Sequence, residues 1–156
     1  MSNSKMFVDE VVDIYNGHQF VVKLQRRGHR CGYVRVNDSA LFEKIKQWYD
    51  AWDNCDFDFD VHGGITFVSD IEGQYLPPGA WIGFDCAHCD DLPDIPAAVV
   101  AFDLSEGDQD DLRLNYRVCY YPGASVCSAD YVRVECYRLI NQLIKYNDTM
   151  LEKEER

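Results

Sequence analysis

Apolar residues in the first part of the chain recur at intervals that predict a helix followed by two strands. Positions 7, 8, 11, 12 and 15 are apolar, which is a helical spacing, and Gly17 is typical of the residue just past a helix end. Segments 18–25 and 31–36 have the pattern of strands, and the basic segment 26–30 between them predicts a turn.

The middle of the chain predicts a second helix and two further strands. Asp38 can cap a helix whose apolar stripe consists of Leu41, Ile45, Trp48, Tyr49 and Trp52. Segment 57–69 alternates apolar and polar residues until Gly63 and Gly64, where we expect a bulge or a close approach of the backbone. Segment 81–87 then predicts a strand that ends at a cysteine.

The last part of the chain contains the clearest helical pattern. Segment 97–104 predicts a short buried strand or the end of a loop, 103–111 a solvated acidic loop, and 113–121 one more strand. Asp130 can then cap a helix with apolar residues at 132, 136, 139, 140, 143 and 144. Residues from about 148 to 156 predict a frayed, charged tail.

This order of elements predicts an α+β fold. We expect a single mixed or mainly antiparallel sheet covered by two or three helices. The chain has 156 residues and shows no internal repeat or linker, so residues 1–156 are predicted to form a single globular domain.

Charge and composition narrow the classes of function. The net charge of −12 disfavours direct binding of nucleic acid or of an anionic membrane, because both would repel an acidic protein. No apolar run approaches the roughly 20 residues that cross a bilayer, and the first residues lack the pattern of a signal peptide. We therefore expect a cytoplasmic protein whose seven cysteines are reduced thiols or ligands.

The charges are segregated along the chain. Segment 25–35 contains four arginines, whereas residues 47–112 contain sixteen acids and neither lysine nor arginine. A basic turn with glycines that let the backbone approach a ligand predicts binding of an anionic small molecule, through Arg26, Arg27, Arg30 and Gly32. The alternative is that these arginines pair with acids of the same chain.

The acidic segment has two interpretations. It forms a solvated surface, or it mimics a nucleic-acid backbone and binds the basic groove of another protein. For the second interpretation, Asp56, Asp58 and Asp60 would lie on one face of a strand, about 6–7 Å apart, a spacing similar to that of phosphates along one DNA strand. The predicted partner-binding acids are Asp50, Asp53, Asp56, Asp58, Asp60, Asp90, Asp91, Asp108, Asp110 and Asp111.

Three short segments contain residue types that bind metals: "GHRCG" with His29 and Cys31, "VHGG" with His62, and "FDCAHCDD" with Cys86, His88 and Cys89. Zinc is bound by four nitrogen or sulfur ligands in a tetrahedron, commonly as two closely spaced pairs. Cys86 and Cys89 make one such pair, and His29 and Cys31 offer a second. His62 or His88 could take the place of a residue of the second pair. Zinc is therefore a candidate cofactor. The alternative is that the cysteines are buried and pack as small apolar side chains.

The same clusters allow a thiol-dependent hydrolase. Cys86 would be the nucleophile (Cys31 is the alternative), His62 or His88 the base, and Asp85 the group that orients the base. Neighbouring acids oppose this hypothesis, because they raise the pKa of a cysteine by repelling the thiolate. A strand end with a buried Cys86 and a hydrogen-bonded His88 is the structural alternative.

Four segments, "CGYVRV", "VHGGITF", "WIGFDCAHCDD" and "ECYRLINQL", resemble a family of small phage- and prophage-associated proteins. The resemblance spans about residues 29–143, and "GFDCAH" is its most specific part. It implies that one aspartate after His88 and the following residues are shared positions: Cys31, Gly32, His62, Gly63, Gly64, Thr66, Asp85, Cys86 and His88. Cys89 falls at a variable position.

The resemblance implies a setting, namely an accessory protein of a phage or mobile element in the bacterial host cytoplasm. Proteins in that setting often act against host defence. We therefore expect an inhibitor of anti-CRISPR or anti-restriction type that binds a host protein through its acids. The alternatives are a small enzyme, either a metal-dependent or a thiol hydrolase, and a binder of a phosphorylated small molecule.

Overall fold

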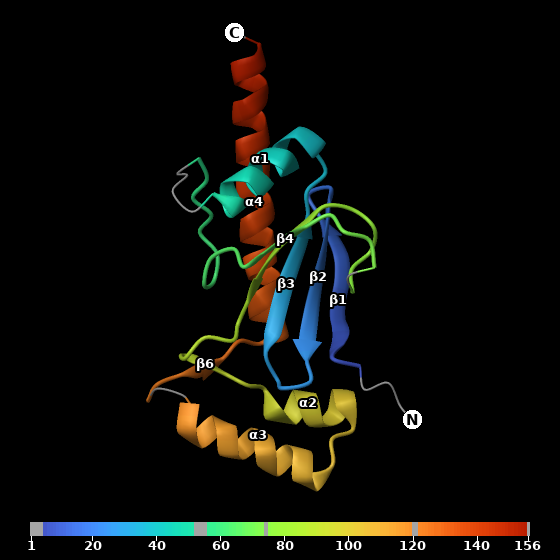
Figure 1. Ribbon diagram of the computed structural model, residues 1–156, viewed down its shortest axis with the longest axis vertical. Helices are drawn as coiled ribbons and strands as arrows, with labels where there is room; N and C mark the ends of the chain where they lie inside the picture. Colours follow the sequence, from blue (N-terminus) through green and yellow to red (C-terminus); the bar gives the residue numbers. More distant parts are fainter. Residues whose placement is uncertain (1–4, 52–55, 74, 120–121, 156) are drawn as a thin grey trace.

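The computed structural model describes residues 5–51, 56–73, 75–119 and 122–155 (Figure 1). Its centre is a five-stranded antiparallel sheet with the strand order β1-β2-β3-β5-β4, and the fold is α+β as the sequence predicts. The strands of this sheet are β1 (Phe7–Tyr15), β2 (His18–Gln25), β3 (Arg30–Arg35), β4 (Phe67–Ser69) and β5 (Trp81–Asp85).

The first predicted helix is wrong, because its residues form strand β1. The register of β1 against β2 shifts between Asp9 and Val11, so the strand contains a bulge with one extra residue. That extra residue breaks the two-residue alternation of a strand and creates the helical spacing seen in the sequence. The hairpin itself turns at Asn16 and Gly17, which both have positive φ, as a two-residue hairpin loop requires.

Helix α4 (Ala129–Glu154) packs along one face of the sheet, against β1, β2 and β3. Its buried side chains, with Cys136 and Leu139 at the centre, form the core together with those of the sheet. Helix α1 (Ser39–Asp50) contacts β4 and α4, and its N-terminus is capped by Asp38, whose side chain accepts a hydrogen bond from the Leu41 N–H, as predicted. Trp52, from the predicted stripe of α1, lies outside the described residues.

Helices α2 (Ile95–Phe102) and α3 (Glu106–Cys119) pack on each other at one end of the sheet (Figure 1). The predicted strand 97–104 is therefore wrong. Of the predicted solvated acidic loop 103–111, residues 103–105 form a loop, whereas residues 106–111 begin α3; most of the segment is exposed. The predicted strand 113–121 is helical up to Cys119, and residues 120–121 lie outside the described part. The apolar run 97–102 is too short for its spacing to distinguish a strand from a helix. Asp94 favours the helix, because its side chain caps the N-terminus of α2 by accepting a hydrogen bond from the Ala97 N–H.

Two short parallel strands, β6 (Asp91–Leu92) and β7 (Ser125–Val126), join distant parts of the chain. Directly after β7, Ser128 caps α4, two residues before the predicted cap at Asp130. The predicted tail is helical up to Glu154. None of the helices in the described ranges combines the length and apolar character needed to span a membrane.

The predicted strand 57–69 exists only at its end, as β4. Residues 57–66 form a loop that packs Phe57 and Phe59 against Trp48 of α1 and Tyr146 of α4. The apolar residues alternate in this segment because the two phenylalanine rings pack between α1 and α4. They do not mark one face of a strand.

We predict that Gly32→Ala destabilises the fold, because a Cβ at this position would lie 2.5 Å from the Phe84 ring and 2.8 Å from the Cys136 sulfur. The expected loss is about 1–3 kcal/mol in the free energy of unfolding, measured by urea denaturation. Gly107→Ala is the matched control, because its Cβ would meet nothing closer than 3.9 Å. Equal stability of the two variants would contradict the packing role of Gly32.

Candidate functional site

The arginine turn does not present its charges to a shared ligand. Arg30 is 5% exposed and forms ion pairs with Glu10 and Asp94, at 2.6 and 2.8 Å. Gly32 is buried between the Phe84 ring and Cys136 of α4, away from the surface. The prediction that Arg30 and Gly32 hold an anion is therefore wrong, and the alternative of pairing within the chain applies to Arg30.

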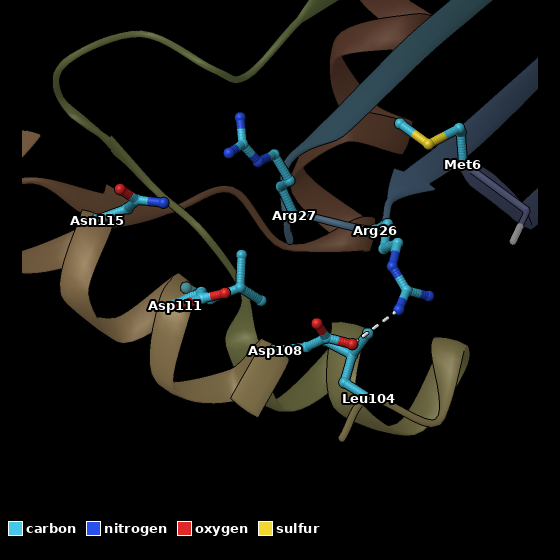
Figure 2. A pocket seen from close by; sticks show the side chains of 8 residues that line it. Met6, Arg26, Arg27, Leu104, Asp108, Asp111 and Asn115 are labelled. Atoms are coloured by element: carbon cyan, nitrogen blue, oxygen red, sulfur yellow. Dashed lines mark hydrogen bonds and ion pairs between the residues drawn. The ribbon is translucent and has the colours of Figure 1, made fainter. Parts of the chain in front are cut away.

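The other two arginines of the turn line a pocket of about 340 Å³ against α3 (Figure 2). Arg26 donates to the carboxylate of Asp108 at 3.0 Å, and Asp111 lies in the same wall. With two carboxylates among its lining groups, the pocket is poorly suited to an anion. Arg26 is occupied by an acid of the same chain, as the alternative interpretation proposed.

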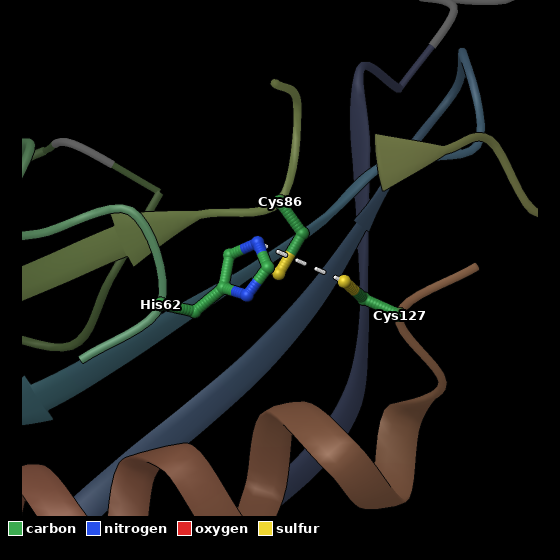
Figure 3. A group of neighbouring side chains, drawn as sticks. All are labelled: His62, Cys86 and Cys127. Atoms are coloured by element: carbon green, nitrogen blue, oxygen red, sulfur yellow. Dashed lines mark hydrogen bonds between the residues drawn. The ribbon is translucent and has the colours of Figure 1, made fainter. Parts of the chain in front are cut away.

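The main cluster of reactive side chains lies where β5, the loop before β4, β6–β7 and the start of α4 meet. It contains two histidines, two cysteines and one aspartate, of which Figure 3 shows three. The members are His62, Cys86, His88, Asp91 and Cys127.

The main-chain groups of both cysteines are hydrogen-bonded to Arg30. The Cys86 N–H donates to the Arg30 carbonyl oxygen at 2.9 Å, which extends the β3–β5 ladder and directs the Cys86 side chain into the core, where it is 1% exposed. Cys127 follows β7, and its carbonyl oxygen accepts a hydrogen bond from Arg30 Nη1 at 3.0 Å. Arg30 therefore fixes the backbone on both sides of the cluster.

Two glycines form the turn that carries His62. The Gly64 N–H donates to the Val61 carbonyl oxygen at 2.9 Å, and both Gly63 and Gly64 have positive φ. The His88 ring lies directly against Gly63, where it fills the space that a Cβ would occupy. The close approach at Gly63 is as predicted, and the glycine pair forms a turn where the sequence offered a bulge as the other expectation.

Asp91 occupies the centre of the cluster and is 2% exposed. Both carboxylate oxygens lie 2.9 Å from His62 Nε2, and Oδ2 also accepts from the backbone N–H and the Nδ1 of His88. The Cys127 thiol donates to Oδ1 at 3.5 Å. Burial alone would raise the pKa of Asp91, but the hydrogen bonds from His62 and His88 outweigh it and hold this pKa below its usual value.

The second nitrogen of His62 belongs to a separate chain of hydrogen bonds. His62 Nδ1 lies 2.9 Å from the Tyr131 hydroxyl, which is also hydrogen-bonded to Glu135. Burial, followed by the hydrogen bond to Glu135, raises the pKa of Tyr131 to about 12. Glu135 is 4% exposed and is held by Arg138. These contacts orient His62 so that Nε2 faces the cysteines.

The side chains of His62, Cys86 and Cys127 offer ligand atoms that all lie within 4.8 Å of one another (Figure 3). The His62 Nε2 to Cys127 Sγ distance is 3.9 Å. A second group, His62 with His88 and Asp91, meets the same criterion. The cluster could therefore hold a metal ion.

The geometry opposes a thiol nucleophile. A hydrogen bond to Cys127, burial and the charge of Asp91 all raise the pKa of Cys86, so the reactive thiolate is scarce at neutral pH. In a nucleophilic triad the acid binds the imidazole nitrogen that faces away from the thiol. Here Asp91 binds Nε2 of His62, the nitrogen that also faces Cys127.

Three predicted site residues do not contribute side chains to the cluster. Cys31 and Asp85 pair with each other across β3 and β5 and lie on the sheet face opposite to Cys86, because neighbouring strand residues alternate between faces. Cys89 is exposed. Of the predicted zinc set of His29, Cys31, Cys86 and Cys89, only Cys86 therefore belongs to the cluster, together with His62, which the sequence offered as a substitute ligand.

His29 supports the cluster without joining it. Its Nδ1 lies 2.8 Å from the Cys86 carbonyl oxygen, so this nitrogen is the donor. Burial lowers the pKa of His29, which favours the neutral ring. The structure thus assigns His29 a positioning role next to Cys86.

The predicted partner-binding acids are spread over separate surfaces. Asp50 is the last residue of α1, and Asp56, Asp58 and Asp60 lie in the segment after it, whereas Asp108, Asp110 and Asp111 lie on α3. Helices α1 and α3 lie near opposite ends of the sheet (Figure 1). Asp90 is exposed and lies in the turn after β5. Asp53 lies outside the described residues. Asp91 is buried, so its assignment to a partner surface is wrong. Asp60 forms an ion pair with Arg138, and Asp110 with Arg113.

Sequence reasoning missed Cys127, Tyr131 and the central role of Asp91. No motif surrounds Cys127, and its approach depends on the pairing of two two-residue strands, β6 and β7. The one usable signal was an aspartate after His88, which the family resemblance implied without choosing between Asp90 and Asp91. No family model matches the chain, and comparisons with curated proteins and with solved structures gave no significant match.

We predict that Gly63→Ala disturbs the cluster more than Gly64→Ala does. Both residues have positive φ, which costs an alanine roughly 1–2 kcal/mol, but only at Gly63 would the Cβ collide with the His88 ring. The expected result is an additional loss of about 1 kcal/mol or more in unfolding free energy. We also expect the NMR resonances of His88 to shift in Gly63→Ala and to stay in place in Gly64→Ala. Identical spectra for both variants would contradict the contact.

Proposed function

We propose that this protein binds a zinc ion through His62 Nε2, Cys86 Sγ and Cys127 Sγ. The observation that carries the proposal is the convergence of these three ligand atoms, from three separate segments, within 4.8 Å of one another. The phage accessory role and the inhibition of a host protein stay predictions.

The distances suit a tetrahedral ion. Bond lengths of about 2.3 Å to sulfur and 2.0–2.1 Å to nitrogen place tetrahedral ligands roughly 3.3–3.8 Å apart. Cys127 Sγ and His62 Nε2 are 3.9 Å apart, and all three atoms need to move by about 1 Å or less to meet this geometry. The fold therefore supports the site without rearrangement of the strands.

The choice of zinc follows from the donor atoms. Two thiols and one imidazole are soft or intermediate ligands, which favour zinc over the oxygen-binding ions magnesium and calcium. The second group, with Asp91 and His88, shares His62 with the first. One imidazole nitrogen binds one ion, so the two groups are alternatives, and the thiol-containing group matches zinc better.

The hydrogen bonds around His62 prepare it as a ligand. A neutral imidazole binds metal through one nitrogen and carries its proton on the other. The Tyr131 hydroxyl, itself hydrogen-bonded to Glu135, accepts a hydrogen bond from His62 Nδ1–H, so Nδ1 keeps its proton. Nε2, which lies against Asp91, then gives up its proton to bind the ion. Such an outer hydrogen bond to a ligating histidine is the usual arrangement in metal sites.

Zinc also resolves the electrostatics of the cluster. Without a cation, the raised pKa of Cys86 keeps its thiol protonated beside the charged Asp91. A divalent ion reverses this preference and binds both cysteines as thiolates, so zinc binding releases protons. The two negative charges of the thiolates then balance the two positive charges of the zinc ion inside the protein.

The test is the zinc content of the natively purified protein, by elemental mass spectrometry combined with thiol titration. We expect a single zinc per chain, and thiols that become reactive when a chelator removes it. The variants Cys86→Ser, Cys127→Ser and His62→Gln should each lose the ion.

Cys89→Ser and Cys31→Ser are the matched controls, because Cys89 is exposed and Cys31 lies on the opposite face of the sheet. Both controls should retain zinc at the level of the unmodified chain. Zinc lost equally from all five variants, or zinc absent from the unmodified chain after supplementation, would refute the assignment. Circular dichroism of each variant separates loss of zinc from loss of fold.

A second prediction concerns Tyr131. Tyr131→Phe removes the acceptor for His62 Nδ1–H, and we expect zinc affinity to fall by about 10–100-fold, measured by competition with a chromophoric chelator. Tyr49→Phe is the control, because the Tyr49 hydroxyl also donates a hydrogen bond, but to the Thr66 carbonyl oxygen. An unchanged affinity in Tyr131→Phe would show that the outer hydrogen bond does not tune the ligand.

A further inference from the structure

We propose that the zinc ion has an open fourth position on the side of Asp91 and His88, where a bound water hydrolyses an uncharged carbonyl substrate. This inference rests on the zinc site proposed above. It goes further because it assigns an activity, a substrate class and a general base.

The number of converging ligands is the first argument. Within the described residues, the groups that could hold a metal ion each contain three members, and the group with both cysteines lacks a fourth side chain at the same spacing. Structural zinc sites have four protein ligands, whereas catalytic sites have three and leave one position for water. Three ligands therefore indicate the catalytic type.

Asp91 Oδ1 supplies the second argument. Its donors are His62 Nε2–H and the Cys127 thiol, and both lose their protons when these residues bind zinc. A buried carboxylate oxygen without a donor is costly. A water on the ion restores a donor to Oδ1, while Oδ2 stays anchored by the backbone and ring of His88.

The two histidines connect this side of the site with solvent. The His88 side chain is 38% exposed and that of His62 is 18% exposed, whereas Asp91 is almost fully enclosed. The approach for a small substrate therefore lies along the partly exposed His88 side chain.

The charge of the site selects the substrate class. Two thiolates cancel the two charges of zinc, and Asp91 adds a negative charge in a chain of net charge −12. A phosphate ester would meet repulsion from both. An uncharged ester or amide carbonyl avoids it, so we assign the site to neutral acyl compounds.

The chemical step balances without a further reactant. The water gives a proton to Asp91 Oδ1, its oxygen bonds to the carbonyl carbon, and the carbonyl π electrons move to the carbonyl oxygen. The bond from carbon to the leaving group then breaks, and the leaving group takes the proton from Asp91. Water and the acyl compound thus give a carboxylic acid and an alcohol or amine.

The experiment measures hydrolysis of p-nitrophenyl acetate by the zinc-loaded full chain, with the zinc-free chain as background and bis(p-nitrophenyl) phosphate as the anionic probe. We expect zinc to raise acetate hydrolysis at least about 100-fold over background, with little phosphate hydrolysis. Asp91→Asn should keep its zinc and lose about 100-fold or more of the zinc-dependent rate.

Asp90→Asn is the matched control, since Asp90 is the exposed neighbour of the buried Asp91. A cobalt-substituted unmodified chain adds a test that needs no variant, because added imidazole, a neutral ligand that the charge of the site does not repel, should change its visible spectrum only if a position is open. A chain that binds zinc yet shows no hydrolysis above background, or no imidazole effect, would overturn the inference and leave the zinc site standing. Absence of zinc binding would instead refute the site itself.

Discussion

The buried carboxylate of Asp91 connects segments that the sheet alone does not bring together. A buried charge is costly unless it is hydrogen-bonded, and Asp91 receives bonds from His62, His88 and Cys127. These donors come from the loop before β4, the turn after β5 and the end of β7. Each of these segments has little regular structure of its own, so the carboxylate and its donors define where they meet.

Arg30 extends this arrangement from the site into the sheet. Its guanidinium group is buried between Glu10 and Asp94 and also donates to the Cys127 carbonyl oxygen. Glu10 sits at the bulge of β1, and Asp94 caps α2, so one side chain links the sheet edge, the helix pair and the site. An anion-binding role for Arg30 would break these links, and removal of one partner would leave a buried charge unpaired.

Strong local patterns explain what the sequence could predict. Strands β2, β3 and β5, the cap at Asp38 and most of α4 follow from periodicity, and "GFDCAH" drew attention to Cys86 and His88. The rest depended on non-local facts. The bulge in β1 gives its apolar residues a helical spacing. Cys31 faces away from Cys86 because it pairs with Asp85, and this register cannot be read from the sequence. No local pattern signals that β6 pairs with β7 and brings Cys127 to the site.

The zinc proposal changes how the cluster contributes to stability. Without the ion, the site is held by hydrogen bonds around one carboxylate, and the Cys86 thiol has a raised pKa. With the ion, the same residues are joined by metal–ligand bonds, and the free energy of metal binding adds to the free energy of folding. That coupling acts on the turn carrying His62 and on the end of β7, where the ligands lie. The sheet and α4 have a large apolar core of their own and do not depend on it.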